Sequence, residues 1–305
     1  MRSPTQPTLS EKDIAAIVSE ALGAGLAGAE ELSGGTFAAV WRAGLDDGRQ
    51  VVVKVAPPAS ARMLRYESGI IPAEAEYFSM VREQAPGVPV PEVLAVSAEW
   101  IITSLLPGAP LASNDSARAR TELGAAIRQV HTITGAHFGY TGDRATGPDW
   151  PTAFHGIIEA LRADAADWNV PLPPLSGVVE RHHDVLATVT RPALLHFDLW
   201  DGNVLVGPDG AMTGLVDGER YLYGDPLLDF VSPALFRRIE EIPDHPFLAG
   251  YRPEPFDESA RTRLSLYRVH LYTLMIAEGP SRGIERSEGR HDYLIGLLEA
   301  ELAGL

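Results

Sequence analysis

Two carboxylates and an amide lie close together in the second half of the chain, with a spacing that suits phosphoryl transfer. His196, Asp198 and Asn203 form the pattern H-x-D-x-x-x-x-N, and Asp217 follows after two short apolar runs. In phosphoryl transfer one carboxylate orients the attacking hydroxyl, while an amide and a second carboxylate hold the magnesium that neutralises the phosphates. The pattern therefore indicates a magnesium-dependent site for phosphoryl transfer.

The segments that follow Asn203 explain how these side chains could meet. Residues 204–206 and 212–216 have the apolar character of short strands, and Gly207-Pro208-Asp209-Gly210 between them is typical of a turn. A hairpin would place Asn203 and Asp217 side by side at its open ends, as converging magnesium ligands require. The alternative is a surface loop that ends in a hairpin, since a single eight-residue match is weak evidence; features near the N-terminus favour the site.

A lysine in an apolar strand is the first of these features. Lys54 lies in residues 50–56, which we predict to be a buried strand because the run is apolar and is bounded by Asp47-Gly48 and Pro57-Pro58. The chain has only two lysines, at positions 12 and 54, against 23 arginines. The alternative to a phosphate-binding lysine is an edge-strand lysine whose ammonium group reaches solvent.

A pair of glycines precedes this strand in the chain. Gly34 and Gly35 form a small-residue turn before the apolar strand start at residues 36–41. Glycine lets backbone N–H groups approach a phosphate without interference from a Cβ. We therefore predict a nucleotide lid here, with an ordinary tight turn as the alternative.

A phosphate-binding lysine of this kind is usually oriented by a glutamate on a helix. Residues 72–83 have a helical pattern, and Glu74 shares the face that carries the apolar side chains of Tyr77, Phe78 and Val81. We predict Glu74 as the partner of Lys54, with Glu76 as the reserve candidate. The alternative is that both glutamates are solvated charges on the helix.

The order of these motifs resembles that of the aminoglycoside phosphotransferase family, which is related to fructosamine kinases, choline kinases and, more distantly, protein kinases. Trp200 makes the 196–203 loop especially similar to the fructosamine-kinase branch. Two positions depart from the family pattern: Phe197 replaces a common glycine, and Asp217-Gly218-Glu219 replaces the commoner Asp-Trp or Asp-Phe-Gly. The matching segments are residues 32–36, Lys54, 74–78, 105–108, 196–203, Asp217 and 224–229.

The resemblance implies an α+β, two-lobed, protein-kinase-like fold. Residues 1–103 would form the nucleotide-binding lobe, a small antiparallel sheet with one packed helix, and residues 104–108 a hinge. Residues 109–305 would form a mostly helical lobe that carries the catalytic groups and binds the acceptor. Helical periodicity predicts its helices at residues 117–131, 152–169, 175–190, 260–278 and 291–302.

The resemblance also implies the role of each residue. Asp198 would be the catalytic base or the group that orients the acceptor hydroxyl; Asn203 and Asp217 would bind Mg²⁺, and Lys54 the α- and β-phosphates. The hinge backbone at Ser104 and Leu106 would hold the adenine of ATP, with GTP as the other possible donor. We also expect His196 to support the loop, and Asp225 and Asp229 to tie a helix start beneath it, with Asp225 as the N-terminal cap of that helix. Five further residues are candidates for the acceptor pocket, with plain packing as the alternative: Glu219, Tyr221, Tyr223, Glu278 and Arg282.

The composition narrows the class of partner and the setting. The net charge of −16 argues against nucleic acid and would suit a cationic small substrate, although an acidic surface can serve solubility alone. The chain contains no cysteine, which excludes disulfides and thiolate chemistry. With no long apolar segment and no apolar core of a secretory signal near Met1, we predict a cytoplasmic protein without a membrane span. The sequence does not indicate an oligomeric state.

The hypothesis that follows is an ATP-dependent kinase of a small hydroxylated molecule: an amino sugar, an aminoglycoside-like antibiotic or a fructosamine. Two alternatives stay open. A catalytically silent nucleotide-binding regulator would be expected to carry a damaged metal or base position, and none is visible. A protein kinase is disfavoured because no Ala-Pro-Glu follows Asp217.

Overall fold

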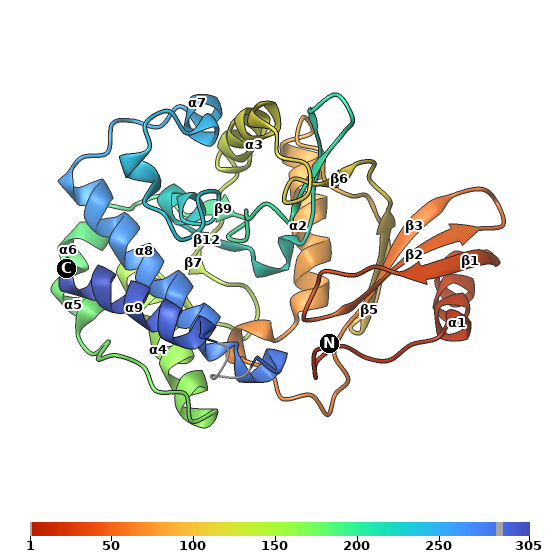
Figure 1. Cartoon of the computed structure of the whole chain (residues 1–305), viewed down its shortest axis with the longest axis horizontal. Coiled ribbons are helices and arrows are strands. Elements are labelled where there is room, and N and C mark those ends of the chain that lie inside the picture. Colours follow the sequence, from red (N-terminus) through yellow and green to blue (C-terminus); the bar gives the residue numbers. More distant parts are fainter. Residues whose placement is uncertain (1, 285–288) are drawn as a thin grey trace.

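A five-stranded antiparallel sheet forms the N-terminal lobe of the chain, whose computed structural model describes residues 2–284 and 289–305 (Figure 1). Its strand order is β1-β2-β3-β5-β4, so neighbours along the chain pair as hairpins except at the β3–β5 contact, where the intervening chain forms α2 and β4. The elements of this lobe are α1 (Glu11–Leu22), β1 (Leu26–Glu31), β2 (Ala39–Leu45), β3 (Gln50–Val55), η1 (Arg65–Glu67), α2 (Ile70–Gln84), β4 (Val93–Val96) and β5 (Trp100–Ser104).

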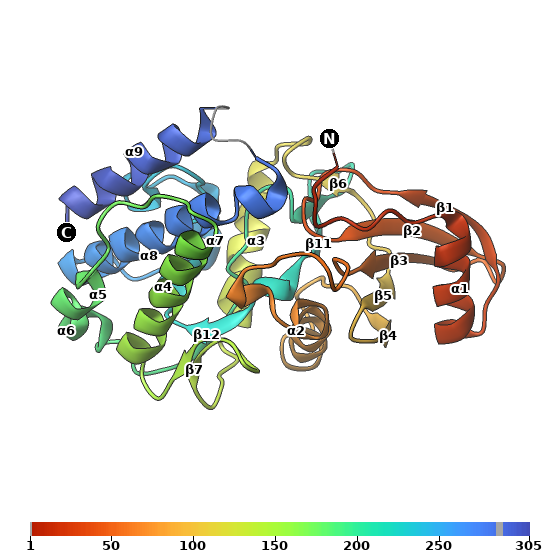
Figure 2. The same ribbon diagram turned by 90° about the horizontal axis from the view of Figure 1, so that it is seen from below.

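Two helices cover this sheet, one on each face, as the side chains of strand β3 show. Successive residues of a strand point to opposite faces. Val53 belongs to a buried cluster with Ile14 and Val18 of α1, whereas the next residue, Lys54, reaches Glu74 on α2. Figure 2 shows α1 on the outer side of the sheet and α2 between the sheet and the rest of the molecule. The expected helix is therefore α2, and α1 is a further helix that the sequence-based description of this lobe did not include.

The C-terminal lobe is mostly helical, as expected. Its long helices bury apolar faces, and α8 is buried along most of its length because α4 and α9 both pack against it. The helices are α3 (Ala117–Val130), α4 (Trp150–Asp167), α5 (Val178–Arg181), α6 (His183–Leu186), η2 (Gly218–Arg220), η3 (Pro226–Phe230), η4 (Ile239–Glu241), α7 (Pro246–Tyr251), α8 (Glu258–Ala277), η5 (Pro280–Arg282) and α9 (Arg290–Ala303).

The single helix predicted over residues 175–190 was wrong. The structure has two short helices, α5 and α6, that are separated at His182, whose backbone leaves the helical region at φ −112° and ψ 18°. The His182 ring lies 2.8 Å from the Val178 carbonyl oxygen, and such a local side-chain bond offers the backbone an alternative to helix continuation. The apolar periodicity did not reveal this break.

Two small sheets complete the C-terminal lobe, and one of them contains the predicted hairpin. Strands β10 and β11 pair antiparallel, with Val204 opposite Leu215, so the hairpin is confirmed. Strand β6 pairs with β10, which means that the chain enters this lobe directly after the 105–108 segment. The strands are β6 (Ala109–Pro110), β7 (Phe138–Gly139), β8 (Thr146–Gly147), β9 (Ala193–Leu195), β10 (Val204–Val206), β11 (Met212–Leu215) and β12 (Leu222–Gly224). Among the described residues, no helix is both long and apolar enough to cross a membrane.

A buried histidine supports the loop that follows β9. His270 of α8 is fully buried, and its ring stacks on Phe197 with centroids 4.7 Å apart. Phe197 adopts φ +66°, in the left-handed region that favours glycine. The stack therefore gives a physical reason why phenylalanine is tolerated where many members of the resembled family have glycine.

Burial lowers the pKa of His270 to about 3, and this makes stability depend on pH. Because an unfolded histidine titrates near 6.5, the unfolded chain binds more protons between pH 3 and 6.5, and stability must fall as the pH falls through this window. We expect the free energy of unfolding to decrease by about 2 kcal/mol from this group between pH 7 and pH 5. Urea unfolding at both pH values measures it. In His270→Phe, which keeps a flat ring on Phe197, the decrease should be smaller; an unchanged decrease would contradict the assignment.

Candidate active site

Lys54 lies at the centre of three carboxylates that come from both lobes. Its Nζ is 2.9 Å from Glu74 Oε2 on α2 and 2.9 Å from Asp217 Oδ1 at the end of β11, and it also bonds to Glu219. Lys54, Glu74 and Glu219 are buried, while the side chain of Asp217 is 42% exposed. Asp217 is thus the member of this cluster that remains open to a ligand.

The charges in this cluster depend on one another. Burial by itself disfavours the Lys54 ammonium, but the three carboxylates outweigh burial and raise its pKa well above the ordinary value. Burial raises the pKa of Glu74 to about 8, even though Lys54 opposes the shift. Burial also favours the protonated form of Asp217, yet the attraction of Lys54 prevails and lowers its pKa. One ammonium group therefore keeps Asp217 charged.

The β10–β11 hairpin brings the predicted metal ligands together. The Val216 N–H donates to the Asn203 carbonyl oxygen at 3.0 Å, so Asn203 and Asp217 lie at adjacent ends of the two strands. The Asn203 Nδ2 donates to the Asp198 carbonyl oxygen at 2.9 Å, which leaves Oδ1 as the acceptor end of that amide. An amide oxygen beside an ionised, half-exposed carboxylate is a donor set that fits Mg²⁺. Glu74, Asp217 and Glu219 are also close enough to hold a metal, but Lys54 already lies among them as their cation.

Asp229 and His196 fix the loop that carries Asp198 through hydrogen bonds. Asp229 accepts hydrogen bonds from the backbone N–H groups of His196 at 3.0 Å and Phe197 at 2.6 Å. His196 lies 3.0 Å from the Val216 carbonyl oxygen through Nε2, and its Nδ1 accepts from the Asp198 N–H at 3.2 Å. Burial lowers the pKa of His196, which favours the neutral ring that this acceptor role needs. These contacts are those of a supporting residue, the role expected for His196.

Asp225 lies at the start of η3, where a cap was expected. Its side chain accepts from the Leu227 N–H at 3.1 Å, and it also pairs with Arg263 at 2.5 Å and accepts from the Tyr267 hydroxyl at 2.6 Å. All of these partners belong to the C-terminal lobe. Asp225 therefore ties the element beneath the loop to α8.

Arg220 faces Asp198, and the sequence analysis did not identify it. Its Nε is 3.7 Å from Asp198 Oδ2, and its Nη2 is 2.8 Å from Glu278 Oε1. Tyr66 also bonds to Glu278, and the Arg220 guanidinium lies 5.6 Å from the centre of the Tyr66 ring. The only hint in the sequence is an arginine three residues after Asp217; its direction depends on partners that lie far along the chain.

The five acceptor-pocket candidates have different partners in the structure. Glu219 lies on Lys54 and Glu278 on Arg220, so both belong to the charged network around Asp198 and Asp217. Arg282 bonds instead to Glu67 and Glu278. The Tyr221 hydroxyl donates to Glu76 at 2.6 Å, and the Tyr223 hydroxyl lies 3.1 Å from the Met80 sulfur, so these two tyrosines join the C-terminal lobe to α2.

The hinge and glycine positions lie at the ends of strands of the five-stranded sheet. The Ser104 N–H already donates to the Glu92 carbonyl oxygen at 2.9 Å, so Ser104 could offer adenine its carbonyl oxygen but not this N–H, and Leu106 is half-buried. Gly34 and Gly35 lie in the loop between β1 and β2, and Gly34 adopts φ +120°, a conformation that glycine accepts readily.

Gly218 follows Asp217 and has no side chain, which allows Tyr77 of α2 to pack closely against the backbone there. A Cβ at this position would lie 2.1 Å from Cδ1 of the buried Tyr77. We expect Gly218→Ala to lower the free energy of unfolding by about 1–3 kcal/mol, because a well-packed site must shift to admit the methyl group. Urea unfolding measures this loss. Gly296→Ala on α9, where a Cβ would meet nothing within 4 Å, is the control and should be neutral or up to about 1 kcal/mol stabilising; equal effects would contradict the packing argument.

Comparisons with known proteins concern the family and the fold of the chain. A model of the "Phosphotransferase enzyme family" matches residues 28–266. "Probable ketoamine kinase YniA" of Escherichia coli strain K12 is 30% identical over 154 residues, which is 45% of this chain and 52% of that protein; the chain thus spans about half the length of the curated relative.

Solved structures show the fold. A crystal structure of a "putative fructosamine-3-kinase" from Thermobifida fusca YX-ER1 has a TM-score of 0.68 at 24% identity, and the match covers 95% of this chain and 98% of that one. Another, from Haemophilus somnus 129PT, has a TM-score of 0.71 at 17% identity and covers 95% and 96%. At these identities the likeness concerns the fold, and it confirms the predicted α+β, two-lobed architecture.

Proposed function

The chain belongs to the phosphotransferase enzyme family, and from this premise we propose that it transfers the γ-phosphoryl group of ATP to a hydroxyl group of a small molecule. The observation that carries the proposal is the position of Lys54, 2.9 Å from both Glu74 on α2 and Asp217 after β11. A lysine held in this way between the lobes can meet the α- and β-phosphates of a nucleotide whose metal is bound by Asp217 and Asn203.

Asp198 is the proposed catalytic base. It accepts the hydroxyl proton as the acceptor oxygen forms a bond to the γ-phosphorus; the bond from that phosphorus to the bridging oxygen breaks, and ADP leaves. The loose transition state of phosphoryl transfer needs positioning and charge neutralisation more than a strong base. Arg220, 3.7 Å from Asp198, adds a positive charge on the acceptor side.

Asn203 and Asp217 are the proposed ligands of Mg²⁺, which when bound neutralises charge on the phosphates. Glu219 is the cluster member that nucleotide phosphates would most directly replace at Lys54, because Glu74 orients the lysine and Asp217 serves the metal. The backbone near Leu106 is the proposed adenine contact. GTP is kept as an alternative donor, because the choice between the two bases depends on the hinge backbone and on the shape of the pocket.

A ketoamine, the class that includes fructosamines, is the first acceptor to test. Support comes from the 30% identity to the E. coli protein named as a ketoamine kinase. Trp200 follows Asp198 by two positions in the chain and is 39% exposed, and an exposed indole can pack against the apolar face of a sugar or attract a cation. The net charge of −16 is also compatible with a cationic acceptor.

Mass spectrometry of reaction products tests the proposal. The purified protein is incubated with Mg²⁺ and either ATP or GTP, together with fructosamines, amino sugars, aminoglycosides, choline-like alcohols and a generic protein substrate. We expect one phosphoryl group to be gained by a small molecule, with fructosamines the most reactive class, and no product when Mg²⁺ is chelated. Transfer to the protein substrate alone would contradict the proposed acceptor class.

A further inference from the structure

Arg282, in the C-terminal lobe, contacts two elements that surround the proposed nucleotide site. We propose that it is a positioning residue, which fixes both the start of α2 and the glycine loop (residues 33–38) to the C-terminal lobe. The inference rests on the proposed function for its consequence, nucleotide affinity, but the contacts themselves are features of the fold and do not depend on that function.

The first contact is a buried ion pair with the segment that leads into α2. Arg282 Nη2 bonds to Glu67, and the same nitrogen lies 3.3 Å from Glu278 Oε1. Glu67 is 1% exposed and Arg282 7%. Glu67 lies two residues before Gly69, the N-cap of α2, and α2 carries Glu74 to Lys54. An ion pair buried at this point restricts where α2 can begin, and therefore where Glu74 can lie.

The second contact is with the glycine loop. The Arg282 guanidinium lies 4.9 Å from the centre of the Phe37 ring, as in a cation–π interaction. The N-terminal segment binds the other side of this loop: Gln6 Nε2 donates to the carbonyl oxygens of Gly35 at 3.0 Å and Ala38 at 3.2 Å. Pro4 of that segment lies against Gly283, the residue after Arg282. The loop is thus fastened to the C-terminal lobe close to Arg282.

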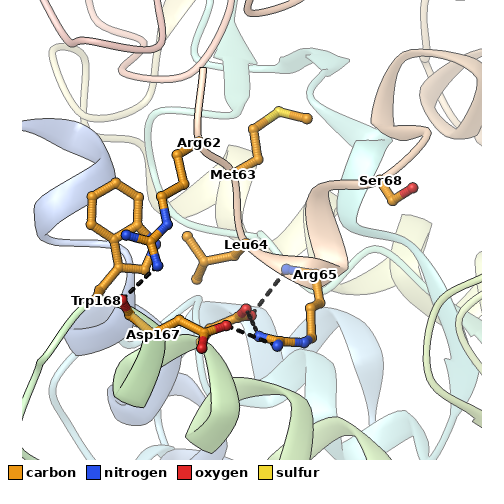
Figure 3. Close-up of a pocket in the computed structure, with 8 residues that line it drawn as sticks. Arg62, Met63, Leu64, Arg65, Ser68, Asp167 and Trp168 are labelled. Atoms are coloured by element: carbon orange, nitrogen blue, oxygen red, sulfur yellow. Dashed lines mark hydrogen bonds and ion pairs between the residues drawn. The ribbon is translucent and has the colours of Figure 1, made fainter. Parts of the chain in front are cut away.

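Residues 62–68, which lead into α2, also contact the end of α4, and an exposed contact there supplies a control. Figure 3 shows Arg65 with Asp167 beside a cavity of about 390 Å³ that residues 62–65 and 68 line together with the end of α4. Arg65 pairs with Asp167 at 2.8 Å and also with Asp164, which is only 3% exposed, so the loss of Arg65 would leave a buried carboxylate without its cation. Arg62 is exposed; it donates to the Asp167 carbonyl oxygen, and its guanidinium lies 4.4 Å from the centre of the Trp168 ring. Exposed contacts contribute little, whereas removing one partner of a buried pair leaves a costly unpaired charge. Arg282, rather than Arg62, should therefore control the position of α2.

Hydrogen exchange of the ligand-free protein, followed by Mg²⁺–ATP binding, tests the proposal. Because Arg282→Met alone leaves Glu67 buried and unpaired and can unfold the protein, the main variant is the doubly neutral Glu67→Gln/Arg282→Met. We expect faster exchange in residues 33–40 and 69–77 than in wild type, and about tenfold weaker binding of Mg²⁺–ATP by calorimetry. In Arg62→Gln, which removes an exposed contact with the same end of α4, both regions should exchange as in wild type.

Arg282→Lys separates the two contacts. A lysine can still pair with Glu67 but lacks the planar group that stacks on Phe37, so residues 69–77 should regain protection while residues 33–40 exchange faster. The proposal is overturned if the double variant exchanges like wild type in both regions, or if Arg62→Gln reproduces its effects. Since exchange is measured without nucleotide, a failure to phosphorylate any acceptor would count against the proposed function and not against this inference.

Discussion

Replacing Asp198 by alanine is expected to lower kcat for phosphoryl transfer by about 10²- to 10⁴-fold, the usual contribution of a positioned acid–base group. Asp198 lies 3.7 Å from Arg220, and within the described part of the chain the ion pairs of Lys54 are with Glu74, Asp217 and Glu219 and not with Asp198. Mg²⁺–ATP should therefore still bind with nearly wild-type affinity. Initial rates with the best acceptor from the product screen, together with calorimetric nucleotide binding, measure both quantities.

Asp209→Ala is the matched control for this experiment. Asp209 is an exposed acid in the turn of the β10–β11 hairpin, so its loss removes the same charge at a distance from the loop that carries Asp198. Its kcat should be close to that of wild type. Equal rates in wild type and Asp198→Ala, for every accepted substrate, would remove Asp198 from the mechanism.

Replacing Lys54 by methionine is expected to lower the free energy of unfolding, the affinity for Mg²⁺–ATP and kcat. Three carboxylates would lose their common cation, and two of them, Glu74 and Glu219, are buried. Removing one partner from such a buried group costs about 3–5 kcal/mol, and at neutral pH part of that loss is relieved if Glu74 takes up a proton. Methionine cannot donate a hydrogen bond to the phosphates as the Lys54 ammonium does. In the protein that remains folded, kcat should therefore be about 10²–10³ times lower than in wild type.

The other lysine of the chain provides the control. Lys12 lies exposed on α1, so Lys12→Met should leave both the urea midpoint and the binding of Mg²⁺–ATP unchanged. Lys54→Met that binds Mg²⁺–ATP as tightly as wild type would show that this cluster is a structural ion network and not a phosphate site.

Short-range patterns in the sequence were sufficient to predict several individual elements of the fold, whereas the two-lobed architecture was expected from the family resemblance. The β10–β11 hairpin depends on two apolar runs and a turn of four residues, so all of the information lies within about 15 positions. The strand that carries Lys54 and the helix that carries Glu74 follow from apolar runs and helical periodicity of similar length. The Asp225 cap before Pro226 is equally local, because it bonds to the backbone two residues later.

Local patterns were insufficient where a side-chain bond competed with the helix. The periodicity of residues 175–190 is compatible with one helix, but the His182 ring binds the Val178 carbonyl oxygen and the helix divides there. Periodicity describes which faces are apolar, and it contains no term for a bond of this kind. The absence of α1 from the expected lobe has another origin, because the family resemblance implied a single helix there. Local signals for α1 are present in the sequence: Ser10 caps its start, Ile14 and Val18 form its buried face, and Gly23 ends it.

The sequence by itself determined which chemical groups are present, in what order, and on which local elements Lys54, Glu74, Asn203 and Asp217 lie. Only the tertiary structure decided where the other charged groups point: Glu219 to Lys54, Arg220 to Asp198, and Arg282 to Glu67 across 215 positions of the chain. The physical reason is that a charged side chain buried on folding must find its counter-charge in space. Lys54 and Glu219, like Glu67 and Arg282, lie in different lobes, so their meeting depends on how the lobes pack. Arg220 and Asp198 belong to one lobe and meet because the chain between them folds back, and spacing in the sequence records neither arrangement.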